Sequence, residues 1–423
     1  MMKRLWFFIS ILILSIFLNS KNIRFAIISD IHLYDTTLGV RSEEFKKYIM
    51  QDRKLLKESS FLLDQFLEDI QKESLDFILI PGDITKDGEL VNHKLFIEKV
   101  SKILDGKTKI FVICGNHDIN NFDGFKYEEK GKVRVEGISK KDFENLYQNF
   151  GYLNSFSKDE NSLSYIARLN EDYFLVALDG CKYYLNDEKN PSTVSGKIKK
   201  KSLLWLKDNL EKLKDQNKKV IVMIHHNIIE HFKGQKKGYP EYVLENNEEL
   251  LKILNSYNVQ LIFTGHFHSN DITKRKFKNG YMFEIETGSP LTFPSPYRIV
   301  EILNDTFVKI QTFSLLKSPE FYSYAKEYTE SGIYNIAFNI IKSYKISDME
   351  SDLLAKKISY AMVSHYRGDE TMPEKFFENK DFSIKSKFIM FLKKDMFKNL
   401  LNDPTPDNNV VINLYSGEIS NLK

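Results

Sequence analysis

The chain has 423 residues, 42% of them hydrophobic and 28% charged, which suits a globular protein with one large domain and a smaller one. Its formal net charge is +3 and its lysines are scattered, so no basic stripe for nucleic acid stands out and a DNA-repair nuclease is disfavoured. Two cysteines, Cys114 and Cys181, cannot form the framework of a fold of this size. Each ends an apolar run, so we expect two buried thiols, with a disulfide as the alternative in an oxidising compartment.

Residues 1–20 predict a secretory signal peptide or an uncleaved signal-anchor. Lys3 and Arg4 precede the uncharged segment 5–18, and Ser20 offers a small residue for cleavage. A basic start followed by an apolar stretch of roughly 7–15 residues is typical of a signal peptide, whereas about 20 residues are needed to cross a bilayer. We therefore expect an exported protein that is periplasmic, on the cell surface or secreted, with this segment as an alternative membrane anchor.

Short apolar runs alternate with segments of helical period in the first part of the chain. The runs predict strands, and the segments with apolar residues at helical spacing predict helices. In chain order these are strand 24–29, helix 43–72, strand 77–81, helix 91–104, strand 109–114, strand 173–178, helix 200–213, strand 219–224, helix 248–254 and strand 259–264. The alternation predicts an α/β fold in which parallel strands carry helices on both faces of the sheet.

The pattern changes twice after the last of these strands. Residues 272–314 predict antiparallel strands, including a hairpin around Asn279 and Gly280. Residues 321–397 are rich in Lys, Tyr and Phe and predict three or four helices, after which two prolines precede a short, extended tail. The sequence thus divides into a leader, an α/β domain, a helical domain and a tail, with the boundaries 1–20, 21–316, 317–402 and 403–423.

Five of the predicted strands end in residues that bind metal ions, and six of the nine histidines lie in these turns. The carboxyl ends of strands in an open α/β sheet share one edge, where ligands bind. Carboxylate, amide and imidazole groups without thiolate suit Mn, Fe or Zn, and they are too numerous for one ion that keeps an open position. Two ions about 3.5–4 Å apart, bridged by one carboxylate, would use them all.

The five turns carry the motifs D-x-H, G-D, G-N-H-D, a single His and G-H-x-H, in this order between Asp30 and His268. Together they resemble the calcineurin-like metallophosphoesterase superfamily. The resemblance implies a four-layer αββα sandwich over residues 21–316, with the small helical domain following it. It also implies two divalent metal ions, one held by Asp30, His32 and His268, the second by Asn116, His225 and His266, with Asp83 between them. His225 is preferred to His226 because the ligand directly follows the strand, and His226 then contacts the ligands or substrate or forms a turn.

The resemblance also places His117 beside the metals without binding them. Two bound cations lower the pKa of a shared water, so that a bridging hydroxide is available for in-line attack near neutral pH. His117 can then protonate the leaving oxygen, and we expect Asp118 to hold its other ring nitrogen.

Other histidines and aromatic residues have simpler interpretations. We expect His93, His231 and His365 to be buried core residues. Tyr34 and Phe267 border the site and could stack on a base, although packing is their more common role.

The motifs also bear on the substrate. A monoester dianion is commonly clamped by arginine, and the protein phosphatases of the superfamily carry arginine in their second and third motifs. Residues 82–88 and 114–118 contain none, which favours a phosphodiesterase for a small, singly charged diester. Further segments resemble the bacterial branch related to class III cyclic-nucleotide phosphodiesterases, namely 82–89 with His93, 288–290, 296–298 and 365–370.

The expected substrate is therefore a cyclic nucleotide or a similar small diester. Export leaves cytoplasmic cyclic nucleotides out of reach, so an exported enzyme would scavenge extracellular nucleotides, and other functions stay open. One alternative is an exported phosphodiesterase or phosphatase that acts on glycerophosphodiesters or phospholipids. A more remote alternative is a surface protein that binds metal and no longer catalyses.

Overall fold

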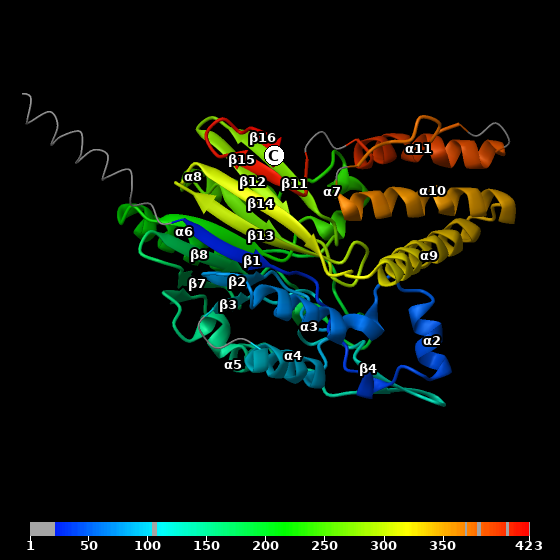
Figure 1. The fold of residues 1–423 in the computed structure, drawn as a ribbon, viewed down its shortest axis with the longest axis horizontal. Coiled ribbons are helices and arrows are strands. Elements are labelled where there is room, and N and C mark those ends of the chain that lie inside the picture. The colour runs from blue at the N-terminus through cyan, green and yellow to red at the C-terminus, as the bar shows by residue number, and fades with distance from the viewer. Residues whose placement is uncertain (1–21, 104–107, 369, 379–381, 403–405, 423) are drawn as a thin grey trace, which may run out of the picture.

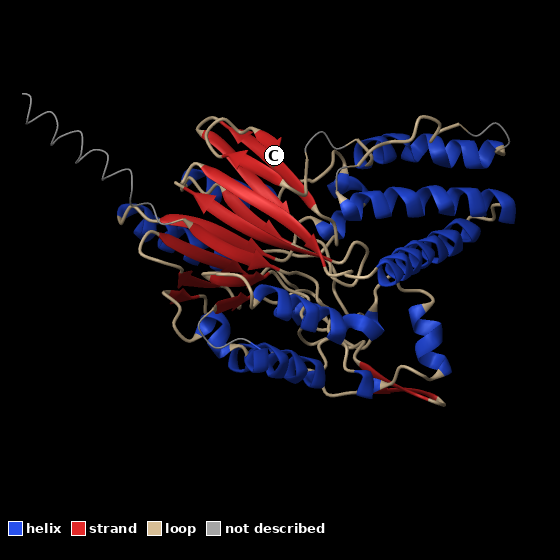
Figure 2. Cartoon of the chain, in the orientation of Figure 1, coloured by secondary structure: helices blue, strands red, loops and turns tan. Residues whose placement is uncertain are grey.

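The fold is built around two seven-stranded β-sheets that pack face to face (Figure 1, Figure 2). The computed structural model describes residues 22–103, 108–368, 370–378, 382–402 and 406–422. The predicted signal peptide or signal-anchor lies outside these residues. None of the helices in the described ranges combines the length and the apolar character that a membrane span requires.

The first sheet contains the strands that begin and end the described chain. Its order is β16-β15-β14-β13-β1-β2-β3. The strands are β1 (Ile23–Ile27), β2 (Phe77–Ile80), β3 (Lys109–Val112), β13 (Pro296–Leu303), β14 (Phe307–Ser314), β15 (Val410–Asn413) and β16 (Ile419–Asn421). β1, β2 and β3 are parallel, and β2 is buried throughout because both faces of the sheet are covered.

The second sheet has the order β11-β12-β10-β9-β8-β7-β6. Its strands are β6 (Ser157–Lys158), β7 (Tyr165–Arg168), β8 (Tyr173–Leu178), β9 (Lys219–Ile224), β10 (Leu261–Thr264), β11 (Asp271–Phe277) and β12 (Gly280–Glu286). The hairpin around Asn279 is confirmed, because Phe277 pairs with Gly280 across a two-residue turn.

Helices cover the outer faces of both sheets, which gives the expected αββα layers. α3 (Ser59–Ile70) lies on the first sheet, where Phe66 contacts Tyr297 of β13 at 5.3 Å between ring centroids. α6 (Lys200–Asp215) and α8 (Asn247–Ser256) bury their leucines against the second sheet. Between the sheets, the rings of Phe25 and Phe263 meet edge to face at 5.3 Å.

The remaining elements of the sandwich are shorter or lie at its edges. They are α2 (Glu43–Ile49), α4 (Leu90–Ile103), α5 (Lys140–Leu146), α7 (Gln235–Gly238) and the hairpin of β4 (Phe125–Glu128) with β5 (Gly131–Arg134). Short 3₁₀ or π turns stand at Thr36–Leu38, Leu56–Glu58, Gln148–Tyr152, Tyr183–Leu185 and Pro240–Tyr242. The sequence pattern predicted none of the elements between residues 125 and 168.

The single helix predicted over residues 43–72 is wrong. The chain leaves the helical path after α2 and resumes it only at the 3₁₀ turn that precedes α3. The Asp52 side chain accepts a hydrogen bond from Lys54 N at 2.9 Å, and Leu55 N donates to Leu291 O at 2.8 Å. Such side-chain and long-range bonds replace the helical ones, so residues 50–55 form a loop.

The helices predicted for residues 321–397 are an insertion between two strands of the first sheet. They are α9 (Pro319–Ser343), α10 (Asp348–Arg367) and α11 (Ile384–Leu400), and they lie together beside the sandwich at the right of Figure 1. Ser318, Ser347 and Ser383 cap their first turns by accepting backbone hydrogen bonds. The tail that follows is extended, as expected, but β15 and β16 continue the first sheet beyond β14.

Gly332 of α9 tests how closely this insertion packs on the loop 50–55. A Cβ atom at this position would lie 2.5 Å from Asp52 O. Replacing glycine by alanine inside a helix normally stabilises it by roughly 0.5–1 kcal/mol. Here we expect Gly332→Ala to lower the free energy of unfolding by about 1–3 kcal/mol in urea titrations, because the loop backbone must move.

Asn339→Ala, on the exposed side of α9, is the matched control and should not destabilise the protein. Equal stability of Gly332→Ala and the wild type would contradict this packing.

Candidate metal centre

All seven predicted metal ligands lie in the turns that follow β1, β2, β3, β9 and β10. Five of them have a left-handed backbone, with φ of 53° at Asp30, 40° at His32, 48° at Asp83, 79° at His266 and 69° at His268. This conformation is uncommon for residues other than glycine, costs about 1–3 kcal/mol each and gathers at functional sites. Here it turns the side chains of separate strands toward one point.

The glycines of the motifs are needed because side chains of neighbouring turns occupy the space beside them. A Cβ atom at Gly115 would lie 2.1 Å from Asp83 Oδ1, and one at Gly265 would lie 2.3 Å from Asp30 Oδ2. These contacts explain why G-N-H-D and G-H-x-H begin with glycine.

Asp30, His32 and His268 form the first ligand group, and all three are buried. The Nε2 atoms of His32 and His268 are 3.2 Å apart, and His268 Nε2 lies 3.5 Å from Asp30 Oδ1. One donor atom from each residue therefore faces a common point.

The second group contains Asp83, Asn116, His225 and His266. His225 Nε2 lies 3.4 Å from Asp83 Oδ2 and 3.1 Å from Asn116 Oδ1, and the ligand atoms of Asp83, His225 and His266 lie within 4.8 Å of one another. Asp83 Oδ2 is also 3.7 Å from His32 Nε2 in the first group. Asp83 thus lies between the two groups.

The charge states of these residues fit metal ions. Burial lowers the pKa of His32, His266 and His268 well below its ordinary value, so their imidazoles are neutral, as ligands must be. Two neutral Nε2 atoms at 3.2 Å repel each other where both present lone pairs, and a cation between them removes that repulsion. Imidazole, carboxylate and amide donors suit Mn, Fe or Zn.

His225 shows the excess of negative charge in the centre. Burial opposes its protonation, but the charges of Asp83 and Asp30 raise its pKa well above the ordinary value. Burial and the charge of Asp83 raise the pKa of Asp30 to about 6, although His225 opposes the shift. Divalent cations would take the place of that proton and keep both carboxylates ionised.

Residues 23–270 match the calcineurin-like phosphoesterase family. The chain belongs to this family. It is 22% identical over 203 residues to a probable cyclic nucleotide phosphodiesterase of Xenorhabdus bovienii, and 29% identical over 208 residues to a probable glycerophosphodiester phosphodiesterase of Arcobacter nitrofigilis. The alignments cover 46% and 47% of this chain, and 62% and 58% of these curated relatives. The match thus spans about three-fifths of the length of each relative.

Solved structures of similar shape include a dimetal phosphatase from Danio rerio and a purple acid phosphatase from yellow lupin. The first is 16% identical, the match covers 69% of this chain and 96% of the phosphatase chain, and the TM-score is 0.49. The second is 12% identical, covers 71% and 52%, and has a TM-score of 0.45. Both scores are low, so the family assignment rests on the sequence match.

In this phosphoesterase chain the partner of His117 is Asp87, so the prediction that Asp118 holds the ring is wrong. His117 Nδ1 donates to Lys86 O at 2.7 Å and to Asp87 Oδ1 at 2.8 Å. A ring nitrogen of His117 lies within 4.8 Å of donor atoms of His32 and Asp83, so the ring stands beside the ligand groups.

The charges around this pair favour a protonated imidazole. Burial opposes protonation of His117, but Asp83 and Asp87 outweigh it and raise its pKa. Burial alone would raise the pKa of Asp87, yet the fully buried Lys86, which pairs with it, and His117 lower it to about 2. His117 can thus hold a proton beside the site.

Asp118 fixes the turns instead. Its carboxylate accepts hydrogen bonds from Gly115 N at 2.8 Å and from Thr85 N at 2.9 Å, and its backbone oxygen accepts one from His93 Nε2 at 3.0 Å. Asp118 therefore ties the turn after β3 to the turn after β2. His93 is buried, as predicted.

The loop 50–55 adds two cations that the sequence analysis missed. Lys54 is buried, and its charge contributes, after burial, to the low pKa of His32. After burial, the charges of Arg53 and Lys54 also lower the pKa of His268. The sequence predicts a continuous helix over these residues, and no local pattern marks them as part of a site.

Other residues singled out in the sequence are buried but are not part of the two ligand groups. His226 bonds to Val194 O at 2.8 Å, and its ring lies 4.3 Å from that of His266, so it supports a ligand. Tyr34 is fully buried and donates to Gly39 O, which leaves it no face for a base. Cys114 and Cys181 are buried and free.

His231 and His365 are buried, as expected, but they belong to a network of carboxylates. His231 lies 2.8 Å from Asp271 and 3.2 Å from Glu284, and His365 lies 2.5 Å from Glu370 and 3.8 Å from Asp271. The end of α10 is thereby tied to β11, whose first residue, Asp271, follows His268 by three residues.

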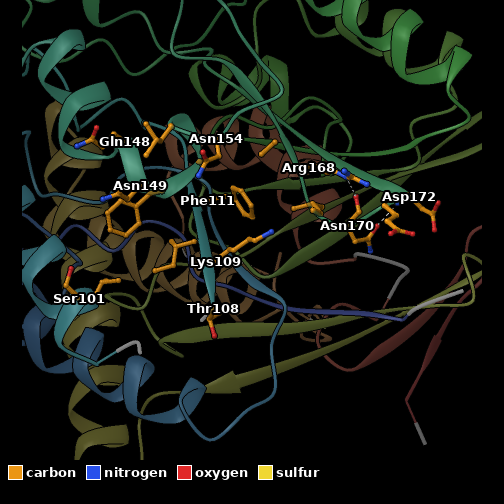
Figure 3. Close-up of a pocket in the computed structure, with 18 residues that line it drawn as sticks. Ser101, Thr108, Lys109, Phe111, Gln148, Asn149, Asn154, Arg168, Asn170 and Asp172 are labelled. Atoms are coloured by element: carbon orange, nitrogen blue, oxygen red, sulfur yellow. Dashed lines mark hydrogen bonds between the residues drawn. The ribbon is translucent and has the colours of Figure 1, made fainter. Parts of the chain in front are cut away.

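A cavity of about 1000 Å³ lies away from these residues (Figure 3). It is lined by Lys109 at the start of β3 and by Asp172 before β8, whereas the ligands follow the strand ends. It contains none of the predicted site residues and is separate from the metal centre.

The Asp87–His117 pair can be tested through the leaving group. A proton donor matters for an alkoxide and little for 4-nitrophenolate, so His117→Ala should slow an alkyl diester by about 10²–10⁴-fold and the nitrophenyl diester far less. Asp87→Asn should act in the same direction. The measurement is kcat/KM for both substrates.

Asp118→Asn is the control, and any loss there should be equal for the two substrates. If His117→Ala instead lost kcat/KM equally for the two substrates, His117 would not be the proton donor.

Proposed function

We propose that the protein is a metal-dependent phosphohydrolase with two divalent ions, and that it acts on phosphodiesters. The observation that carries the proposal is the position of Asp83, whose Oδ2 lies 3.7 Å from His32 Nε2 and 3.4 Å from His225 Nε2. One carboxylate oxygen thus faces both ligand groups, as a pair of ions that act on one phosphate requires.

The chemistry divides between the ions and the chain. Bound divalent ions would polarise the phosphoryl oxygens and supply hydroxide at neutral pH. His117, whose Nδ1 is held by Asp87, donates a proton to the leaving oxygen. Lys54 is close enough to lower the pKa of the ligand histidines and adds positive charge for the anionic substrate.

A diester is supported by two observations. The curated relatives from Xenorhabdus and Arcobacter are named as phosphodiesterases. The turns that carry Asp83 and Asn116 contain no arginine to clamp a monoester dianion. Arg53 and Lys54 add charge from another loop, so a phosphatase is the second candidate.

The first twenty residues support a proposal of export, in which the enzyme meets its diester outside the cytoplasm.

Asp83→Asn tests the dinuclear centre. Loss of the shared charge should reduce the metal content from two ions per chain and slow hydrolysis of bis-nitrophenyl phosphate at least 10²-fold. Elemental analysis and the nitrophenolate rate with added Mn measure both effects. The wild-type rates for bis-nitrophenyl phosphate, a diester, and for nitrophenyl phosphate, a monoester, are then compared to distinguish a diesterase from a phosphatase.

Asp172→Asn, exposed near the opposite ends of the strands, is the matched control and should change neither value. A wild-type protein that binds two ions but hydrolyses no ester would favour the non-catalytic alternative.

Lys54→Gln tests the added positive charge. Hydrogen bonds to charged groups contribute about 1.5–3 kcal/mol, so KM for the diester should rise about tenfold or more while kcat changes little. Lys57→Gln, three residues away and exposed, should leave KM unchanged. A KM that is equal in all three proteins would exclude Lys54 from substrate binding.

A further inference from the structure

An apolar chamber of about 410 Å³ lies among the three inserted helices and extends to Phe267, in the turn that carries the ligands His266 and His268. α9, α10 and α11 each contribute to its wall, which is made mainly of aliphatic and methionine side chains, including Ile333, Ile336, Leu354, Ile358, Met390 and Met396. A small hydrophilic diester has no use for such a space, because its walls offer few polar partners.

The inner end of the chamber adjoins the metal ligands. Phe267 lies between two ligands in sequence, and the ring of Tyr242 is 4.7 Å from that of His266. Arg53 also lines this end, and its Nε has no hydrogen-bond partner within the described residues. A phosphate at the metal centre would therefore have a cation and an apolar passage beside it.

The outer end of the chamber is open to solvent. Ile340 and Tyr344 line it from the end of α9 and are 54% and 56% exposed. A chain that enters at this rim can thus run between the helices toward Phe267.

α11 carries a second apolar face on its outside. Its inner face lines the chamber with Met390 and Phe397, whereas Ile384, Phe388, Phe391 and Leu392 project outward at helical spacing. Ile384 is 88% exposed and Phe391 is 72% exposed.

Lysines accompany this outer face. Lys385, Lys387 and Lys394 are exposed on α11, and the exposed Lys393 stands at the side of the helix that lines the chamber. Exposed aromatic and aliphatic residues mixed with lysines are typical of a helix that lies in the interface of an anionic membrane. A solvent-exposed apolar face of this kind otherwise calls for a protein partner.

We propose that the substrate is a membrane phospholipid whose phosphodiester binds at the metal centre while its acyl chain occupies the chamber and α11 rests on the membrane. This inference rests on the proposed phosphodiesterase function and specifies its substrate class. The outer face of α11, the open rim and Arg53 beside the ligands together provide a route from the membrane surface to the catalytic edge.

A series of 4-nitrophenyl alkyl phosphodiesters, from methyl to dodecyl, tests the chamber. Burial of each methylene should lower KM by up to about fourfold until the chamber is filled, whereas the methyl ester has no chain to bury. Ala337→Trp, which fills the chamber from α9, and Ile340→Asp at the rim should abolish this dependence. Both variants should hydrolyse the methyl ester as the wild type does.

The methyl ester separates the two proposals. If the wild type hydrolyses no ester, the proposed function fails. If it hydrolyses the methyl ester but its KM does not depend on chain length, only the acyl-chain assignment is overturned. Ile340→Asp covers the case in which Ala337→Trp does not fold, because residue 340 is largely exposed.

Vesicles of equal parts phosphatidylcholine and phosphatidylglycerol test the outer face. The double variant Phe388→Ser with Phe391→Ser should bind them at least tenfold more weakly than the wild-type full chain in sedimentation assays. Leu204→Ser, on the exposed side of α6, is the matched control and should bind as the wild type does.

Equal vesicle binding by the double variant and the wild type would overturn the membrane role of α11. A wild-type dimer in light scattering that becomes a monomer in the double variant would also overturn it, by assigning the face to a second copy of the chain.

Discussion

The metal centre depends on the carboxylate of Asp83, because both ligand groups share it. The turn after β2 delivers it with a left-handed backbone, and its Oδ1 approaches Gly115 so closely that no side chain fits there. The same oxygen accepts the backbone N–H of His117 at 2.9 Å. One residue thus lies between the two ligand groups and anchors the backbone of His117, the proposed proton donor. A buried carboxylate is costly without compensation, which bound cations would provide.

The motif residues were predictable because each directly follows an apolar strand. Parallel strands bring their carboxyl ends to one edge, so the order of the strands matters little and the local sequence is sufficient. The partner of His117 was not predictable in this way. Asp118 is adjacent in sequence, but it points to Gly115 N and Thr85, and Asp87 reaches the ring from another loop. Which carboxylate reaches an imidazole depends on turn geometry that composition does not encode.

Long-range contacts account for the rest of what sequence missed. Residues 50–55 have apolar neighbours at helical spacing, but the bond from Leu55 to Leu291 and the contact of Asp52 with Gly332 draw them out of the helix. β15 and β16 are too short to be recognised alone; β15 pairs with β14, about a hundred residues earlier, and β16 pairs with β15. In each case the partner lies far along the chain, so local propensity was overridden.

The inserted helices are fixed to the catalytic edge rather than merely attached to the sandwich. His365, in the last turn of α10, lies between Glu370, which follows the helix, and Asp271, which stands three residues after the ligand His268. Removing one member of such a network leaves a buried charge unpaired, so its geometry resists change. Within α9, Gly332 lacks a side chain and so allows the helix to pack closely on the loop that carries Lys54. The helices therefore pack on the loop that carries Arg53 and Lys54. Under the proposed function, a substrate held between the helices would be aligned with the metal ligands before the reaction begins.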